Sequence, residues 1–267
     1  MRFISYIYLI AVTLSLFTLL PSLELNIGYE SKDHYLLLFF LKWILVLISI
    51  TAWIYIKGKA KPKSIERLPI ILFALALVSQ ITILARDTLS LQTYLDIIEK
   101  GQNYPSATAY EIKTGYLDID GPIGPKTLDS IKEYATKKPV YGISITSDGG
   151  LIDYAKEIGE YIIKNQIDTY VFSHCASACV PIALSGKTSY AKPEAKFGFH
   201  QGSALSKRKN QYAQAIGIDG TNKLWELLED LGVSVKILND MKETPSNSMS
   251  YYTGQELYDD GVIDSLI

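Results

Sequence analysis

Three nearly charge-free stretches in the first third of the chain constrain its fold more than any other feature. They run from 3 to 20, from 35 to 56 and from 68 to 85, in a sequence of 267 residues. A helix that crosses a bilayer needs about 20 predominantly apolar residues, so each stretch is long enough to form one. We therefore predict three transmembrane helices, followed by a domain built from the remaining residues.

The charges between these stretches predict how the chain is oriented. The loop after the second stretch is rich in basic residues, whereas the loop after the first has no basic excess. Because basic loops stay on the cytoplasmic side, the N-terminus is expected inside and everything after Ala85 outside. In a bacterium this describes a multi-pass inner-membrane protein with a periplasmic C-terminal domain. A cleaved signal peptide is the alternative for the first stretch, but residues 19–22 form a poor cleavage site.

The sequence after the third stretch predicts a linker and a globular domain. Residues 87–100 have the apolar spacing of an amphipathic helix, and a cluster of Gly, Asn, Pro and Ser breaks the pattern at 101–106. We predict a membrane region over 1–86, a stalk or linker over 87–108, and an α/β domain over 109–267.

Strand-like and helix-like segments alternate in this last part of the chain. The β-branched run at 140–145 and the short run at 169–172 predict buried parallel strands. The apolar spacing of 151–165 predicts a helix between them. This alternation is typical of a parallel sheet with crossover helices. Further strands are expected at 110–119, 188–191, 196–199 and 262–264, and further helices at 125–136, 178–184, 210–232 with a break near Gly217–Gly220, 233–241, and from the capping-box pattern Thr253–Glu256 to Gly261.

Charge and cysteine content limit the classes of partner. Lys and Arg number 26 against 28 Asp and Glu, which gives a formal net charge of −2. Such a balance gives no attraction to nucleic acid, so we expect no nucleic-acid partner. The two cysteines, Cys175 and Cys179, do not have zinc-site spacing, and neither a metal nor a cofactor is expected. Four residues apart, they are compatible with a disulfide, with two buried thiols or with a redox pair.

Ser177 is the candidate nucleophile of the domain. It lies between two alanines, where a strand-like run gives way to a helix-like one, and His200 is the only histidine after it. A serine hydroxyl needs a base and donors for the oxyanion that it creates, and Gly149 and Gly150 follow a strand in a turn able to present backbone amides. Each feature alone is explained by a helix cap, a structural histidine or a tight turn. Together they are expected at one edge of a parallel sheet, where α/β proteins bind ligands.

In its motifs, residues 115–201 resemble the ClpP/crotonase superfamily, in particular the Clp-type serine peptidases and their membrane-bound relatives. The motifs occur in the order that those peptidases have: a Gly-Gly turn at 149–150, Ala176-Ser177-Ala178, a Gly-then-basic hairpin at 184–190, Pro193, and His200-Gln201. The resemblance implies a ClpP/crotonase-like fold, a peptide or protein substrate, and the homo-oligomeric rings or trimers that Clp-like folds commonly form.

By the same resemblance, Ser177 is the nucleophile and His200 the general base. The backbone N–H groups of Gly150 and Ala178 form the oxyanion hole. Clp peptidases complete the triad with an Asp, but no Asp stands at the expected place in this sequence. Asn247 is the candidate that takes its role.

Two alternatives to this set of catalytic residues come from nearby positions. Ser246 or Glu243 replaces Asn247 in orienting the imidazole, or no residue does. Some membrane-bound relatives use a lysine base, for which Lys187 and Lys192 lie in the matching hairpin.

The sequence thus favours a membrane-anchored serine hydrolase, a peptidase that acts on the periplasmic side. The alternative is a Clp-like fold of little or no activity that serves as a peptide-binding or assembly module, which the missing acid favours. Acyl-CoA chemistry of the crotonase type is a third interpretation, disfavoured because an outward-facing domain has no supply of CoA.

Overall fold

The computed structural model describes residues 67–267. Its α/β unit begins at Thr93, near the C-terminal end of the first described helix. The helices are α3 (Arg67–Gln102), α4 (Thr127–Ala135), α5 (Ile152–Asn165), α6 (Cys179–Leu184), α7 (Gln211–Asp230), α8 (Val235–Glu243) and α9 (Gly254–Asp259). The strands are β1 (Tyr110–Lys113), β2 (Tyr116–Asp120), β3 (Gly142–Thr146), β4 (Asp168–Val171), β5 (His174–Ala176), β6 (Ser189–Ala191), β7 (Lys196–Phe199), β8 (Ser250–Thr253) and β9 (Ser265–Leu266).

The predicted membrane region has to be corrected. In the part of the chain that the structure describes, no helix is both long enough and apolar enough to cross a bilayer. This finding contradicts the predicted span at 68–85, and with it the multi-pass inner-membrane localisation and the periplasmic position of the domain. The apolar stretch is the beginning of α3, which continues as one helix through the charged Asp87 to Gln102. The predicted spans at 3–20 and 35–56 lie outside the described residues.

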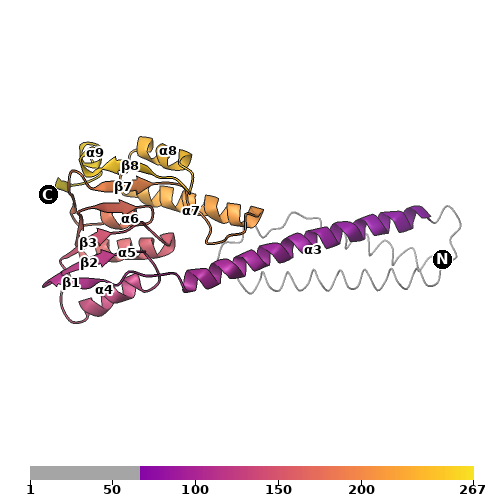
Figure 1. The fold of residues 1–267 in the computed structure, drawn as a ribbon, viewed down its shortest axis with the longest axis horizontal. Coiled ribbons are helices and arrows are strands. Elements are labelled where there is room, and N and C mark those ends of the chain that lie inside the picture. Colours follow the sequence, from indigo (N-terminus) through magenta and orange to yellow (C-terminus); the bar gives the residue numbers. More distant parts are fainter. Residues whose placement is uncertain (1–66) are drawn as a thin grey trace. The chain divides into compact units, whose positions relative to one another are not determined.

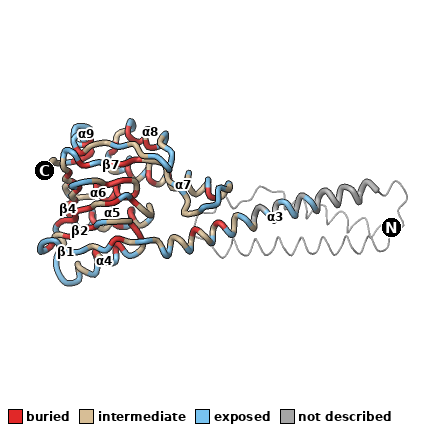
Figure 2. The backbone as a smooth tube through the Cα atoms, viewed as in Figure 1, coloured by how far each residue is buried: buried red, intermediate tan, exposed pale blue. Residues whose placement is uncertain are grey.

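A six-stranded sheet forms the larger layer of the α/β unit (Figure 1). The strand order is β1-β2-β3-β4-β6-β9, and all neighbouring pairs are parallel except β1 with β2. Ile143 and Ile145 of β3 are fully buried in one core with Ile158 and Ile162 of α5 and Ile182 of α6. Figure 2 shows this concentration of buried residues along the central strands, α5 and α6. Apolar burial by crossover helices is what a parallel sheet requires.

The other face of this sheet is covered by tyrosine rings. Tyr170 stacks on Tyr190 with ring centroids 4.9 Å apart, and Tyr116 lies 6.3 Å from Tyr170. A Cβ atom on Gly142 would come within 2.8 Å of the rings of both Tyr116 and Tyr170. The rings therefore close over the glycine. Burial of the Tyr170 ring raises the pKa of its hydroxyl.

A second, three-stranded sheet was not predicted. Its order is β5-β7-β8, with β5 parallel to β7 and β8 antiparallel to it. Only Phe172 and Ser173 separate β4 from β5, so the chain leaves one sheet and enters the other within two residues. The two sheets are joined by an isolated parallel bridge between Ser147 and Cys175. The sequence-based expectation of one parallel sheet is thus replaced by two sheets that meet beside the serine.

Helix α7 is continuous where a break was predicted. Gly217 and Gly220 lie inside it, and the backbone of Gly202 packs against them. A Cβ atom on Gly202 would come within 2.9 Å of the Gly220 carbonyl carbon and of the Thr221 nitrogen. The glycines therefore permit close packing of a loop on the helix and do not end it. The predicted capping box of Thr253 and Glu256 is confirmed at the start of α9.

Candidate functional site

Ser177 occupies a strained turn between strand β5 and helix α6. Its φ angle is +54°, and among the described residues only one other non-glycine residue, Gln166, has a positive φ. A left-handed conformation costs an L-residue about 1–2 kcal/mol. Two backbone hydrogen bonds hold the turn: Ser177 N–H donates to the Gly198 carbonyl at 2.8 Å, and Val180 N–H donates to the Ser177 carbonyl at 3.0 Å. Strain at such a position is a feature of functional sites.

The two cysteines form a disulfide across this turn. Cys175 and Cys179 are four positions apart, with Cα atoms 5.3 Å from each other. This resolves the question that the sequence left open between a bridge and free thiols. By the chain-entropy model, a loop this short gains only about 2 kcal/mol from the cross-link. That gain is similar in size to the cost of the left-handed serine.

His200 lies beside this turn because β7 is parallel to β5. Ala176, the last residue of β5, is paired with Gly198, and β7 ends at Phe199, so Ser177 and His200 emerge at the same end of the small sheet. Burial lowers the pKa of His200 below 6.5, and the backbone of Ser246 opposes this shift. The imidazole is therefore neutral near pH 7, which is the state of a general base.

The second ring nitrogen of His200 has no side-chain partner among the described residues. Its Nδ1 is buried and makes no hydrogen bond within the part of the chain that the structure describes. Asn247, the predicted third member, is exposed and forms no hydrogen bond with any described residue. The backbone of Ser246 is the hydrogen-bonding group that raises the pKa of the ring, although no hydrogen bond of regular geometry reaches Nδ1. Ser177 and His200 line one cavity, described below, and Asn247 is not among its lining residues.

The glycine turn packs directly on Ser177. Gly149 and Gly150 have φ angles of +106° and +156°. A Cβ atom on Gly149 would lie 2.8 Å from the Ser177 Cβ and 3.1 Å from the Ala178 nitrogen. The buried Ser147 hydroxyl accepts a hydrogen bond from Gly149 N–H at 3.0 Å, which fixes the turn. The predicted oxyanion turn therefore touches the predicted nucleophile.

The amides predicted to form the oxyanion hole are not used elsewhere. Ile123 N–H donates to the Gly149 carbonyl, and Leu151 N–H donates to the Ile123 carbonyl. These bonds secure both sides of the turn but leave out Gly150 N–H. Within residues 67–267, neither Gly150 N–H nor Ala178 N–H donates a hydrogen bond. Gly150 lines the cavity described below, whereas Ala178 is buried behind Ser177.

A cavity of about 470 Å³ brings these groups together. The glycine turn, Ser177 and His200 line it, and Tyr104, Ser203 and Leu205 complete its wall. Its volume falls in the range of small-molecule and peptide side-chain sites. The alternative lysine bases, Lys187 and Lys192, are not among its lining residues.

One interacting pair in this cavity was missed by sequence reasoning. His174 Nε2 lies 3.2 Å from an Asp148 carboxylate oxygen, and its Nδ1 lies 3.2 Å from the Ser173 hydroxyl. Both ring nitrogens are thus engaged, which leaves His200 as the histidine with a nitrogen available to Ser177. Asp148 is the residue before Gly149, so its place in the glycine turn was the signal that pointed to the site.

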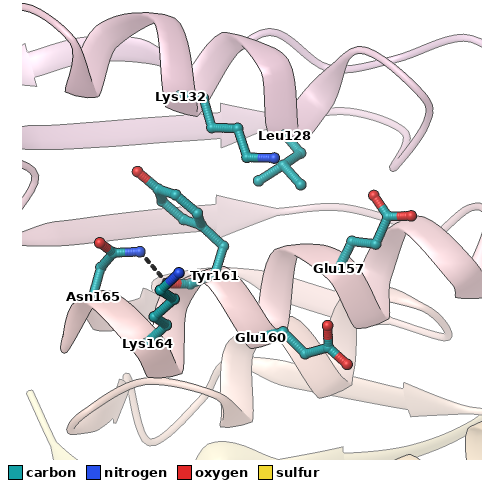
Figure 3. Close-up of a pocket in the computed structure, with 7 residues that line it drawn as sticks. All are labelled: Leu128, Lys132, Glu157, Glu160, Tyr161, Lys164 and Asn165. Atoms are coloured by element: carbon teal, nitrogen blue, oxygen red, sulfur yellow. Dashed lines mark hydrogen bonds between the residues drawn. The ribbon is translucent and has the colours of Figure 1, made fainter.

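A second hollow lies between α4 and α5 (Figure 3). Its volume is about 400 Å³, and Lys132 of α4 faces Tyr161 of α5 across it. Glu157, Glu160 and Lys164 give it charges of both signs. None of its seven lining residues is a serine, cysteine or histidine. It therefore offers no nucleophile, and the cavity at Ser177 is the better candidate site.

Comparison with known proteins does not identify a family. No family model matches the sequence, and no curated protein matches it. A solved structure described only as the crystal structure of an enzyme aligns with 57% of this chain and 94% of its own, at 16% identity and a TM-score of 0.46. Similarity of this degree carries no information about activity.

Proposed function

We propose that this protein is a Clp-like serine hydrolase that cleaves peptides, with Ser177 as nucleophile and His200 as general base. The observation that carries the proposal is a single cavity lined by a left-handed serine, a neutral histidine and a glycine turn with a free amide. A cap serine has no need of positive φ, because an N-cap residue has extended backbone angles. Acyl-CoA chemistry of the crotonase type would not require the serine and histidine.

The reaction follows from the positions of these groups. The Ser177 oxygen attacks the substrate carbonyl carbon and passes its proton to Nε2 of His200. The carbonyl electrons move onto the oxygen, which the N–H groups of Gly150 and Ala178 stabilise. The imidazolium then protonates the leaving amine as the carbonyl reforms, which gives an acyl-enzyme. Water, deprotonated by the same nitrogen, then attacks the carbonyl carbon of the acyl-enzyme. The bond to the Ser177 oxygen breaks, this oxygen takes the proton back from His200, and the acid is released.

The surroundings of His200 predict slow turnover. When Nε2 takes a proton, Nδ1 carries one as well, and no carboxylate of the described residues accepts a hydrogen bond from that Nδ1–H. An acid that orients the base and stabilises the imidazolium is worth up to about 10⁴ in rate in one well-studied triad. We therefore expect a serine that is readily acylated by reactive reagents but that cleaves peptides slowly.

A fluorophosphonate probe tests the proposal directly. It should label wild-type protein at Ser177, and Ser177→Ala should abolish the label. His200→Ala should slow labelling by about 10²–10⁴, the usual contribution of a general base. Ser203→Ala is the matched control, because Ser203 lines the same cavity but has an ordinary backbone conformation. Wild-type protein that stays unlabelled at high probe concentration refutes the hydrolase.

A peptide-binding module without catalysis is the second candidate. The unpartnered Nδ1 of His200 and the exposed Asn247 favour it, since both leave the catalytic set incomplete. In that case a peptide library should yield ligands whose binding is unchanged by Ser177→Ala. No label and no product should then be detected with wild-type protein.

A further inference from the structure

We propose that the Cys175–Cys179 disulfide positions the nucleophile: it holds Ser177 in the left-handed conformation in which this residue lines the substrate cavity. The inference rests on the proposed function, because it assigns a role within the same site. A bridge that positions Ser177 differs from one that only stabilises the fold, because its removal affects the reaction rate and not the stability of the whole domain. Removal of the bridge should slow acylation while leaving substrate binding and the overall fold largely intact.

The anchors of the bridge are rigid on both sides of the serine. Cys175 is the middle residue of β5, where it pairs with Phe197 of β7 and forms the bridge to Ser147. Cys179 is the first residue of α6. Both cysteines are fully buried in the main core. The disulfide therefore connects the middle of a short strand to the first residue of a helix, with the serine turn between them.

Besides the disulfide, the turn is constrained by the packing of Gly149 against it and by two backbone hydrogen bonds. Its backbone is held by the bond from Ser177 N–H to Gly198 and by the bond from Val180 N–H to Ser177. A positive φ costs serine free energy, whereas glycine adopts it without that cost. A loosened turn should therefore relax toward ordinary backbone angles. The peptide unit that follows Ser177 carries the Ala178 N–H. Relaxation would therefore displace the nucleophile and one oxyanion donor together.

The shortness of the loop argues against a role as a general staple. The entropic effect of a cross-link on the unfolded chain grows with the length of the loop that it closes. A bridge between positions four apart is near the minimum, whereas the α/β unit runs from Thr93 to Ile267. The main consequence of the bridge is thus expected at the turn itself.

The experiment compares the full chain with the variant Cys175→Ala/Cys179→Ala and with wild-type protein reduced by a phosphine. Fluorophosphonate labelling is resolved into the reversible binding constant of the probe and the rate constant of inactivation. We expect the inactivation rate constant to fall about tenfold or more, the factor that corresponds to the cost of a left-handed L-residue. The binding constant should change by less than about threefold, and the reduced wild-type protein should behave like the variant.

Amide hydrogen exchange gives a readout that does not depend on hydrolysis. Loss of the bridge should speed exchange at Ser177 and Val180, the two amides that hold the turn, while amides in the middle of α5 stay protected. An unchanged inactivation rate constant overturns the proposal. So does a fall in protection throughout the domain in parallel with the loss of labelling, since that is the signature of a staple.

Failure of the proposed function is distinguishable from failure of this inference. Wild-type protein that is never labelled refutes the hydrolase, and exchange at Ser177 and Val180 then decides the role of the bridge alone. Faster exchange confined to these two amides supports a bridge that holds the turn. Exchange that is the same with and without the disulfide refutes it. The reduced wild-type protein supplies the same comparison where the double variant does not fold.

Discussion

The contact between Gly149 and the serine turn gives the sharpest prediction, tested by Gly149→Ala. The added Cβ atom would lie 2.8 Å from the Ala176 carbonyl oxygen, 2.8 Å from the Ser177 Cβ and 3.1 Å from the Ala178 nitrogen. Real Cβ atoms do not approach backbone atoms so closely, so either the glycine turn or the serine turn must move. The alanine would also have to adopt the φ of +106° that glycine has there.

The expected loss of stability is the sum of these two effects. A left-handed L-residue costs about 1–2 kcal/mol. Forcing an extra methyl group into a packed site costs about 1–3 kcal/mol more. We therefore expect Gly149→Ala to lower the free energy of unfolding by about 2–5 kcal/mol. Because the displaced groups include Ser177, labelling by the fluorophosphonate should fall as well, beyond what the loss of folded protein explains.

Gly232→Ala is the matched control for the backbone effect. Gly232 has a φ of +84°, and a Cβ atom there would have nothing within 4 Å. In this variant the free energy of unfolding should fall only by the cost of the left-handed backbone, about 1–2 kcal/mol, and labelling of Ser177 should be unchanged. Urea unfolding of the full chain measures both variants. Equal losses of stability in the two, or unimpaired labelling in folded Gly149→Ala, would refute the inferred contact between the glycine turn and the nucleophile.

Three further predictions follow from single contacts in the structure. Because burial lowers the pKa of His200 from its usual value near 6.5, the labelling rate should fall at acidic pH with a midpoint below pH 6.5; a midpoint above pH 6.5 in the pH–rate profile contradicts this. Asn247→Ala should change the labelling rate by less than about twofold, since that side chain is exposed and does not line the cavity that Ser177 and His200 line. A tenfold decrease would show that Asn247 orients the base after all. The Thr169 hydroxyl donates a hydrogen bond to the buried Ala183 carbonyl at 2.5 Å, and Thr169→Val removes this donor. The variant should lower the free energy of unfolding, measured in urea, by about 1–3 kcal/mol and leave labelling of Ser177 unchanged. An unchanged stability would contradict the hydrogen bond.

The parts of the fold that sequence predicts are those with a local pattern. The strand at β3, the helix at α5 and the strand at β4 follow from β-branched runs and from apolar spacing, and each lies within one or two residues of its predicted range. The cap of α9 is equally local, because Thr253 and Glu256 stand three residues apart. Each of these signals involves residues within a single helix or strand, so it can be read from a short segment of the sequence.

The second sheet had no such signal. Strand β5 has three residues, its partner β7 comes after α6 and β6, and β8, which pairs with β7, comes near the C-terminal end. Periodicity gives the faces of a strand but not its neighbours, so pairing of this kind cannot be inferred from it. The predicted span at 68–85 failed for a related reason. An apolar run does not show where its helix ends, and α3 continues beyond it to Gln102.

The candidate site was predictable in its parts but not in its connections. The order of the glycine turn, Ser177 and His200 along the chain indicates that they follow strands that end at one side of the domain. The pairing of Asp148 with His174 depends on how the two sheets meet at Ser147, which no local pattern reports. The lack of a partner for Nδ1 depends likewise on the path of residues 244–249, which form a loop.

The division of the strands between two sheets has a consequence for protein synthesis. A chain that has been translated only as far as residue 249 lacks β8 from the small sheet and β9 from the large one. The strand that carries His200 then has a bare edge, and its position beside the serine is unsupported. A nascent or prematurely terminated chain should therefore be inert, so that any hydrolytic activity arises only when residues 250–266 have joined both sheets.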